Sequence, residues 1–165
     1  MARTIPQGMV EKKVQPVRIL FLCTGNSCRS QMAEALLRRA VPTTVVDVAS
    51  AGTDPKPVHP NAIMAMREID VDISAQRSKS LQLFLGQDFD YAITLCEDAQ
   101  RTCPSLPGTA RHLHWPLTDP AAAKGTEEER LEAFRCVRNE LSARIEGLLT
   151  EIFERLLERT RSKQS

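Results

Sequence analysis

The sequence predicts a single α/β domain with a four-stranded, parallel, twisted sheet and helices on both faces. Short, apolar, β-prone runs alternate along the chain with amphipathic helical segments, which is the pattern of a doubly wound fold. The chain has 165 residues, the size of one ordinary domain, and we find no internal repeat or linker. Crossovers between parallel strands are right-handed, and ligands bind beyond the carboxyl ends of the strands.

The first half of the chain supplies two strands and two helices. The first strand is almost entirely apolar, as expected of a strand covered on both faces. Pro42 helps to end the first helix, and Pro60 suits the first turn of the second. The expected elements are a strand over Val17–Leu22, a helix over Ser30–Val41, a strand over Val45–Ser50 and a helix from Pro60 to about Glu68.

The second half supplies two more strands and a long final helix. We expect a helix over Ser78–Leu85, a strand over Tyr91–Leu95, a weaker strand over Arg111–Trp115 and a helix from Glu127 onward. In that last segment apolar residues recur in steps of three and four from Leu131 to Leu156, which gives one helical face. Beyond about Glu154 the helix is longer than a small sheet needs.

Composition excludes several classes of protein. Hydrophobic residues make up 42% of the chain and the net charge is +1, so bulk charge favours neither nucleic acid nor a membrane surface as a partner. No apolar run approaches the length of a membrane span. Residues 1–15 are polar and do not resemble a secretory signal, so we expect a flexible leader before a domain over 16–160. We expect a cytoplasmic monomer.

Five cysteines stand out in a chain of this kind. An odd number is a poor match to a secreted disulfide scaffold and fits thiol chemistry in a reducing compartment better. Their spacing is not that of a zinc site, and we expect no metal and no cofactor. The five are Cys23, Cys28, Cys96, Cys103 and Cys136, of which we interpret Cys136 as structural.

The residues between the first strand and the first helix form a candidate oxyanion site. Small and turn-prone residues let consecutive N–H groups form a concave nest, and the following helix directs its positive end at the same point. An arginine fork can grip two oxygens of a tetrahedral anion, and the same field favours a nucleophilic thiolate at Cys23. The alternative is a buried structural cysteine. The residues of this loop are Cys23, Thr24, Gly25, Asn26, Ser27, Cys28, Arg29 and Ser30, the last placed to donate a hydrogen bond to the thiolate.

Cys96 and Cys103 form a second constellation. If the polar segment between them is helical, the two thiols lie ~10 Å apart, too far to bond. Such a segment can unwind at little cost, so the spacing suits a switch between a reduced helix and an oxidised loop. The alternative is two unrelated cysteines.

Asp119 follows the last predicted strand after a short connection. A carboxyl group beside the oxyanion loop can protonate a leaving oxygen as a general acid. The alternative is an aspartate in a turn before proline, which is common. The three histidines, His59, His112 and His114, are interpreted as surface or strand-end imidazoles.

Taken together, these residues resemble the thioredoxin-coupled arsenate reductases, which share the fold of low-molecular-weight protein tyrosine phosphatases. The matching stretches span about residues 17–150: they are 23–34, 50–52, 72–74, 94–96, 103–104 and 114–120. The loop at Cys23 is common to both groups. The pair Cys96 and Cys103 is what points to the reductases.

The resemblance implies a reaction and a partner. Cys23 attacks arsenate held by the loop N–H groups and Arg29, and Asp119 protonates the departing oxygen. Cys96 attacks Cys23 and arsenite is released; Cys103 then attacks Cys96, and the Cys96–Cys103 disulfide is presented to thioredoxin. Cys28 matches a family cysteine that can pair with Cys23 under oxidation.

The resemblance also implies a potassium site that supports the loop. Asn26, Glu34 and Ser50 match ligand positions, but a further position, an aspartate in some members, is Lys79 here. The lysine ammonium group can take the place of the cation, so we expect no dependence on potassium.

Two other functions stay open from the sequence. A phosphotyrosine phosphatase would use Cys23, Arg29 and Asp119 and ignore the other thiols, although no tyrosine follows Asp119 to stack on a phosphotyrosine ring. A non-catalytic oxyanion or arsenite binder would use the thiols as a redox sensor.

Overall fold

The computed structural model describes residues 14–102 and 106–162, and their core is a four-stranded parallel sheet. The strands lie in the order β2-β1-β3-β4. They are β1 (Val17–Cys23), β2 (Val46–Gly52), β3 (Phe89–Thr94) and β4 (Thr109–His114). The predicted sheet is confirmed, with strand boundaries that differ by one or two residues.

The register of the sheet brings the ends of its strands together. Cys23 at the end of β1 pairs with Gly52 at the end of β2, and Leu22 pairs with Thr94 of β3. Thr94 pairs in turn with His114 at the end of β4. The segments that follow all four strands therefore leave the sheet at the same edge.

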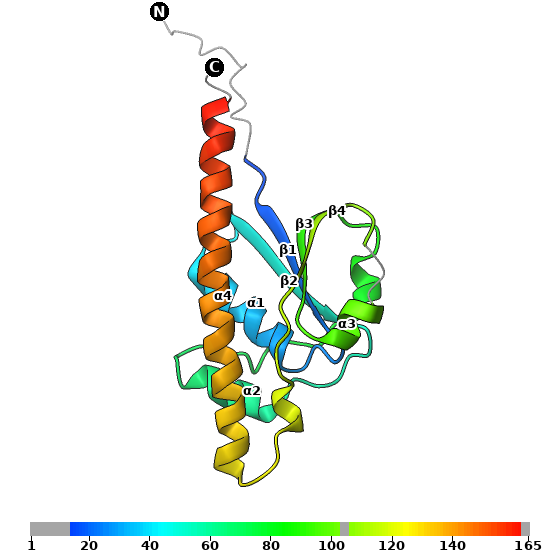
Figure 1. The fold of residues 1–165 in the computed structure, drawn as a ribbon, viewed down its shortest axis with the longest axis vertical. Helices are drawn as coiled ribbons and strands as arrows, with labels where there is room; N and C mark the ends of the chain where they lie inside the picture. The colour runs from blue at the N-terminus through cyan, green and yellow to red at the C-terminus, as the bar shows by residue number, and fades with distance from the viewer. Residues whose placement is uncertain (1–13, 103–105, 163–165) are drawn as a thin grey trace, which may run out of the picture.

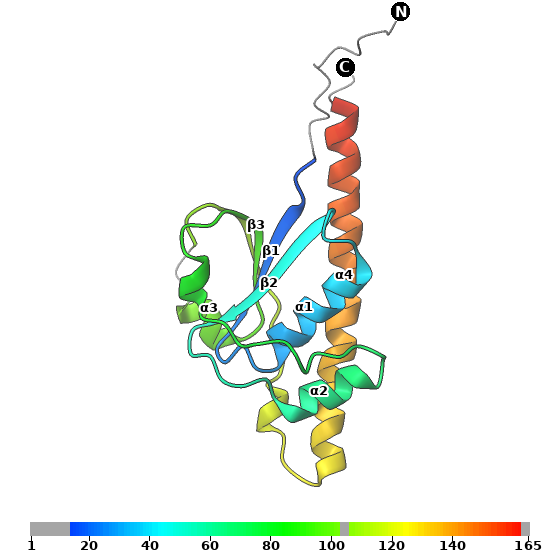
Figure 2. The same ribbon diagram turned by 180° about the vertical axis from the view of Figure 1, so that it is seen from behind.

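Three helices cover one face of the sheet (Figures 1 and 2). They are α1 (Arg29–Ala40), α2 (Pro60–Arg67) and α4 (Glu127–Ser162). Alternate residues of β1, Ile19 and Phe21, are fully buried in the same cluster as Met32 of α1 and Phe134 of α4. This face holds most of the core.

The opposite face carries a smaller core. Here Leu20 and Leu22 of β1 pack with Leu81 and Leu106. The covering elements are the 3-10 helix η1 (Leu81–Phe84) and α3 (Glu97–Thr102), and Figure 2 shows α3 on the side of the sheet away from α4. Helices thus flank both faces, but one layer is much thinner than the other.

Several expectations differ in detail from the structure. The predicted helix over Ser78–Leu85 is reduced to η1, because the backbone of Lys79 is engaged elsewhere: its N–H donates to Asn26 Oδ1 and its carbonyl accepts from Gly52. Cys136, interpreted as structural, lies exposed on α4. Cys103 and the first 13 residues of the expected leader lie outside the described residues, while Val14 is 77% exposed.

Helix α4 runs well past the edge of the sheet (Figure 1). It is 36 residues long, and its last deeply buried side chain is Ile152, which is 1% exposed. Every residue over 158–162 is exposed. Within the described ranges, no helix combines the length and apolarity that crossing a membrane requires.

Candidate active site

The loop between β1 and α1 presents its N–H groups to a cavity because its carbonyl groups are occupied elsewhere. The carbonyl oxygens of Thr24, Gly25 and Ser27 accept hydrogen bonds from the N–H groups of Asp54, Lys56 and His59. The loop residues that line the cavity are Cys23, Thr24, Gly25, Ser27, Cys28 and Arg29. The concave side of the loop is therefore a nest of backbone donors at the N-terminus of α1, which suits an anion.

Asn26 and Gly52 fix the curvature of this loop. Asn26 has φ 46°, in the left-handed region that asparagine tolerates better than most residues. A Cβ atom on Gly52 would lie 2.5 Å from the carbonyl oxygen of Thr24 and 2.9 Å from the nitrogen of Asn26. The end of β2 can approach the loop this closely only because residue 52 has no side chain.

The sulfur of Cys23 lies among hydrogen-bond donors. The N–H of Asn26 donates to Cys23 Sγ at 3.2 Å, and Ser30 Oγ lies 2.8 Å from the same sulfur. Ser30 Oγ also accepts from Asn26 Nδ2 at 2.8 Å, so its single hydrogen is free to point at Cys23. Cys23 is 3% exposed, so these donors approach a buried sulfur.

A buried carboxylate supports the loop from behind. Glu34 is 4% exposed, and Ser50 Oγ donates to it while accepting from Asn26 Nδ2 at 2.9 Å. Two cations neutralise Glu34: Arg38 Nη2 lies 2.7 Å from Oε1 and Lys79 Nζ lies 3.4 Å from Oε2.

These residues do not fit a bound potassium ion. The ammonium group of Lys79 lies beside the carboxylate oxygen that a cation would need, and it also donates to the carbonyl of Arg77 at 3.1 Å. A second cation there would meet like-charge repulsion. Among the described residues, no cluster of three or more His, Cys, Asp or Glu side chains could hold a metal ion.

Cys28, the second thiol of the loop, has a different environment. It is 4% exposed, and burial raises its pKa to about 11. Because that value lies far above neutrality, Cys28 stays a thiol. This environment separates it from Cys23, the loop cysteine that the sequence predicts to be the nucleophile.

The loop opens into a cavity of about 700 Å³ that also receives Arg29, Asp119 and Cys96. Arg29 is held in place by a 3.0 Å hydrogen bond from Nη1 to the carbonyl of Leu117, and its Nη2 lies 3.9 Å from Asp119 Oδ1. Asp119 also accepts from the N–H of Ala121 and is half exposed. A carboxyl and a guanidinium therefore converge at the mouth of the oxyanion loop.

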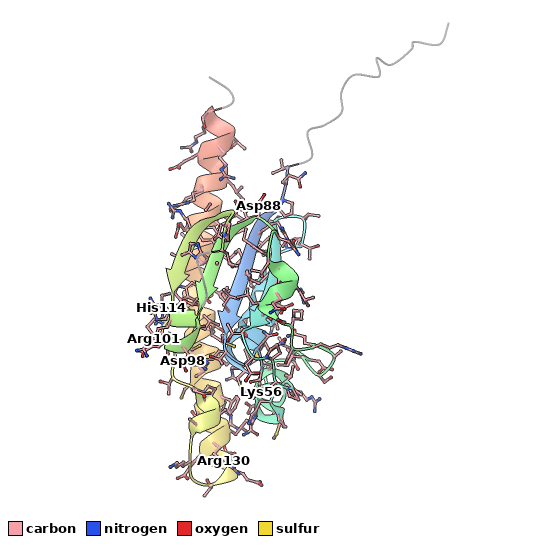
Figure 3. The ribbon with its side chains drawn as sticks, turned by 90° about the vertical axis from the view of Figure 1, so that its right-hand side faces the viewer. Lys56, Asp88, Asp98, Arg101, His114 and Arg130 are labelled. Atoms are coloured by element: carbon pink, nitrogen blue, oxygen red, sulfur yellow. The ribbon has the colours of Figure 1, made fainter. Side chains whose placement is uncertain are left out.

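Cys96 joins the site from the end of β3. Its sulfur lies 3.5 Å from Thr24 Oγ1 in the loop and accepts the N–H of Ala99 at 3.3 Å. Helix α3 follows Cys96 directly, so the segment that the sequence left open between a helix and a loop is helical over Glu97–Thr102. Lys56 and Asp98 also line the cavity, and Figure 3 places them at the carboxyl ends of the strands, with Asp88 at the opposite end.

Three residues around the site were not predicted from the sequence. Gln31 is fully buried and donates to both oxygens of Asn26. His59 is not a simple surface imidazole: its Nδ1 accepts the N–H of Asn61 at the start of α2, and its ring lies 4.8 Å from that of Phe134. Arg38 shares Glu34 with Lys79. Gln31 lies on the buried side of an amphipathic segment, which was the one available signal.

A buried cysteine at the end of a parallel strand, an anion nest and an arginine at the start of the next helix define a class: cysteine enzymes that act on tetrahedral oxyanions. The comparisons with known proteins agree with this class. Residues 18–159 match the family described as low molecular weight phosphotyrosine protein phosphatase, and the chain belongs to that family.

Several individual relatives within this family are named as arsenate reductases. The chain is 47% identical over 127 residues to an arsenate reductase of Halalkalibacterium halodurans, covering 77% of this chain and 91% of the relative. Its fold matches a solved arsenate reductase in the phosphate binding state, with a TM-score of 0.71, 34% identity and coverage of 82% of this chain and 98% of that one. It also matches the thioredoxin-dependent arsenate reductase Cg_ArsC1′ of Corynebacterium glutamicum, with a TM-score of 0.63, 30% identity and coverage of 84% and 63%.

Proposed function

We propose that this chain reduces arsenate to arsenite through a relay of three cysteines, Cys23, Cys96 and Cys103, and is regenerated by thioredoxin. The observation that carries the proposal is a buried thiol, Cys96, that enters the oxyanion cavity from outside the loop. Cys96 is 7% exposed, and its sulfur lies 3.5 Å from the hydroxyl oxygen of Thr24, the residue that follows Cys23 in the loop. A hydrolytic phosphatase needs no such thiol. The relatives named as arsenate reductases, one of them as thioredoxin-dependent, support the same reading.

The chemistry follows from the placement of the groups. The Cys23 thiolate attacks arsenic(V), and Asp119 protonates the oxygen that leaves as water. Arg29 and the loop N–H groups balance the charge of the remaining oxygens. Asn26, Ser30, Ser50, Glu34 and Lys79 hold the loop in shape.

Arsenic is reduced in the step in which Cys96 attacks Cys23. The Cys96 thiolate attacks Cys23 Sγ, a Cys23–Cys96 disulfide forms, and the electron pair of the broken sulfur–arsenic bond remains on arsenic, which leaves as arsenite. Cys103 then attacks Cys96 and releases Cys23. The dithiol of thioredoxin reduces the resulting Cys96–Cys103 disulfide, so two electrons enter for each arsenate reduced.

The direct test is consumption of NADPH by the full-length protein with thioredoxin and thioredoxin reductase, with and without arsenate. We expect consumption that depends on arsenate. Cys103→Ser should lose turnover yet still release one arsenite per enzyme, while Cys136→Ser, on the exposed face of α4, should cycle like the wild type. A Cys103→Ser variant that cycles at the wild-type rate would refute the relay.

A phosphotyrosine phosphatase is the second candidate. Cys23, Arg29 and Asp119 are the groups that phosphate ester hydrolysis would use, and they lie together in the cavity. No aromatic side chain of the described residues lines this cavity, however, so nothing there would stack on a phenyl ring. We therefore expect at most weak hydrolysis of phenyl phosphates, unaffected by Cys96→Ser.

A further inference from the structure

Gln31 is a buried amide to which the proposed reaction assigns no role. It lies in the first turn of α1 and is 0% exposed. Its Nε2 lies 3.0 Å from each of three oxygens: Asn26 O, Asn26 Oδ1 and the carbonyl of Arg77. An amide placed this way ties the oxyanion loop to the segment before η1.

The contact with Gln31 stabilises the backbone conformation of Asn26. Its left-handed backbone costs free energy unless surrounding contacts fix it. Both of its oxygens accept from Gln31, and Ser78 Oγ donates to the same backbone oxygen at 2.8 Å. In this conformation the N–H of Asn26 points at Cys23 Sγ. Any rotation of Asn26 would therefore move a donor away from the sulfur.

Gln76 determines which way the amide of Gln31 faces. Three acceptors around Nε2 leave Oε1 of Gln31 as the group that must accept. Gln76 Nε2 lies 2.6 Å from that Oε1 and 3.2 Å from the backbone oxygen of Gln31. Without this donor Oε1 of Gln31 would be buried without a hydrogen-bond partner, and a shift of the amide toward another donor would weaken its hydrogen bonds to Asn26.

We propose that Gln31 and Gln76 form a positioning pair for the nucleophile: Gln76 orients the amide of Gln31, and Gln31 holds Asn26 so that its N–H stabilises the Cys23 thiolate. The inference rests on Cys23 being the nucleophile, as in the proposed function, and holds for arsenate reduction or phosphate ester hydrolysis alike.

The test compares Gln31→Met, Gln76→Met and the double variant with Gln82→Met. Methionine has nearly the length of glutamine, adds no charge and donates no hydrogen bond. Gln82 is an exposed glutamine of η1 and serves as the matched control. The readouts are the pH profile of iodoacetamide alkylation at Cys23, followed by mass spectrometry of its peptide, the kcat and KM for arsenate, and the melting temperature.

We expect Gln31→Met and Gln76→Met to lower the alkylation rate of Cys23 at neutral pH about tenfold, the size of effect expected for a lost hydrogen bond to a charged group. The midpoint of the pH profile should move upward, and kcat should fall more than KM rises. The double variant should match Gln31→Met alone, because Gln76 acts through Gln31.

Three outcomes would overturn the proposal. Variants that melt earlier but keep the alkylation profile and kcat of Gln82→Met would show that the two glutamines only pack. Effects that add in the double variant would show that they act independently. If Gln31→Met does not fold, the test rests on Gln76→Met, since Gln76 is partly exposed. A wild-type pH profile of Cys23 alkylation in Gln76→Met would then overturn the proposal. If the wild type does not turn over arsenate but the alkylation profiles of the variants shift as expected, the proposed function is wrong and the positioning role of Gln31 and Gln76 is still supported.

Discussion

Gly52 shows how a single missing side chain shapes the site. Its backbone closes the rear of the oxyanion loop at a distance that no Cβ atom tolerates. Gly147, in α4, is the opposite case: nothing lies within 4 Å of a Cβ built there. One glycine is required by its surroundings and the other only weakens a helix.

We therefore predict opposite effects for two glycine-to-alanine substitutions. Gly52→Ala should destabilise the protein by about 1–3 kcal/mol, since the loop backbone must move away, and should lower kcat as the loop shifts. Gly147→Ala should stabilise it by about 0.5–1 kcal/mol, because alanine is the better helix former. Urea unfolding of both variants measures this, and a Gly52→Ala variant as stable as the wild type would contradict the close approach.

The position of Lys79 predicts how the activity depends on the cation of the buffer. Because its ammonium group already neutralises Glu34, replacing potassium with sodium at constant ionic strength should leave kcat and KM for arsenate unchanged. Lys79→Met leaves Glu34 with Arg38 as its cation and should lower activity. A large gain in activity specific to potassium in the wild-type protein would contradict this account of the loop.

The contact between α2 and α4 belongs to the scale of elements. Glu68, the residue that ends α2, accepts hydrogen bonds from Arg135 and Arg138 of α4. The hydrogen bond from Arg135 is the main cause that lowers the pKa of Glu68. A lowered pKa means that the folded state favours the carboxylate, so this contribution to stability is present at neutral pH and is lost as pH falls through the folded pKa.

We predict that Glu68→Gln lowers the melting temperature at pH 7 and that the difference from the wild type shrinks as the pH falls through the lowered folded-state pKa of Glu68, below which the group is protonated in both states. The effect should be small, because the pair is partly exposed and water screens it. Glu132→Gln, an exposed neighbour on α4 that also contacts Arg135, controls for loss of charge alone. A difference that grows as pH falls would contradict the assignment.

The elements also show what the sequence can and cannot predict. The strands follow from short apolar runs, the long helix from apolar residues in steps of three and four, and the oxyanion loop from its turn residues. All three were therefore predictable. The segment Ser78–Leu85 is helical only over Leu81–Phe84, because distant partners, Asn26 and Gly52, engage the backbone of Lys79. The amphipathic pattern of the first helix could indicate that Gln31 is buried, but it could not identify its acceptors, which lie on residues 26 and 77.

At the scale of the whole molecule, α4 is longer than the sheet it covers. Residues 158–162 are exposed and helical, and their packing contributes little to the core. We predict that truncation after Leu157 leaves arsenate reduction unchanged and shifts the melting temperature only slightly. Light scattering of both proteins also tests the expected monomer; a fall in mass larger than the deleted residues would show that the end of α4 holds two copies together.

The direction of the sheet has a practical consequence. The first described residues and the end of α4 lie at the same end of the molecule, and the strands run away from it (Figure 1). The cavity is lined by residues that follow the carboxyl ends of the strands, such as Thr24 and Cys96. A protein fixed to a bead or an electrode through either end of the described chain would present the mouth of the cavity to the solution. Such a surface should still accept a protein reductant, so the proposed relay can also be tested on the immobilised protein.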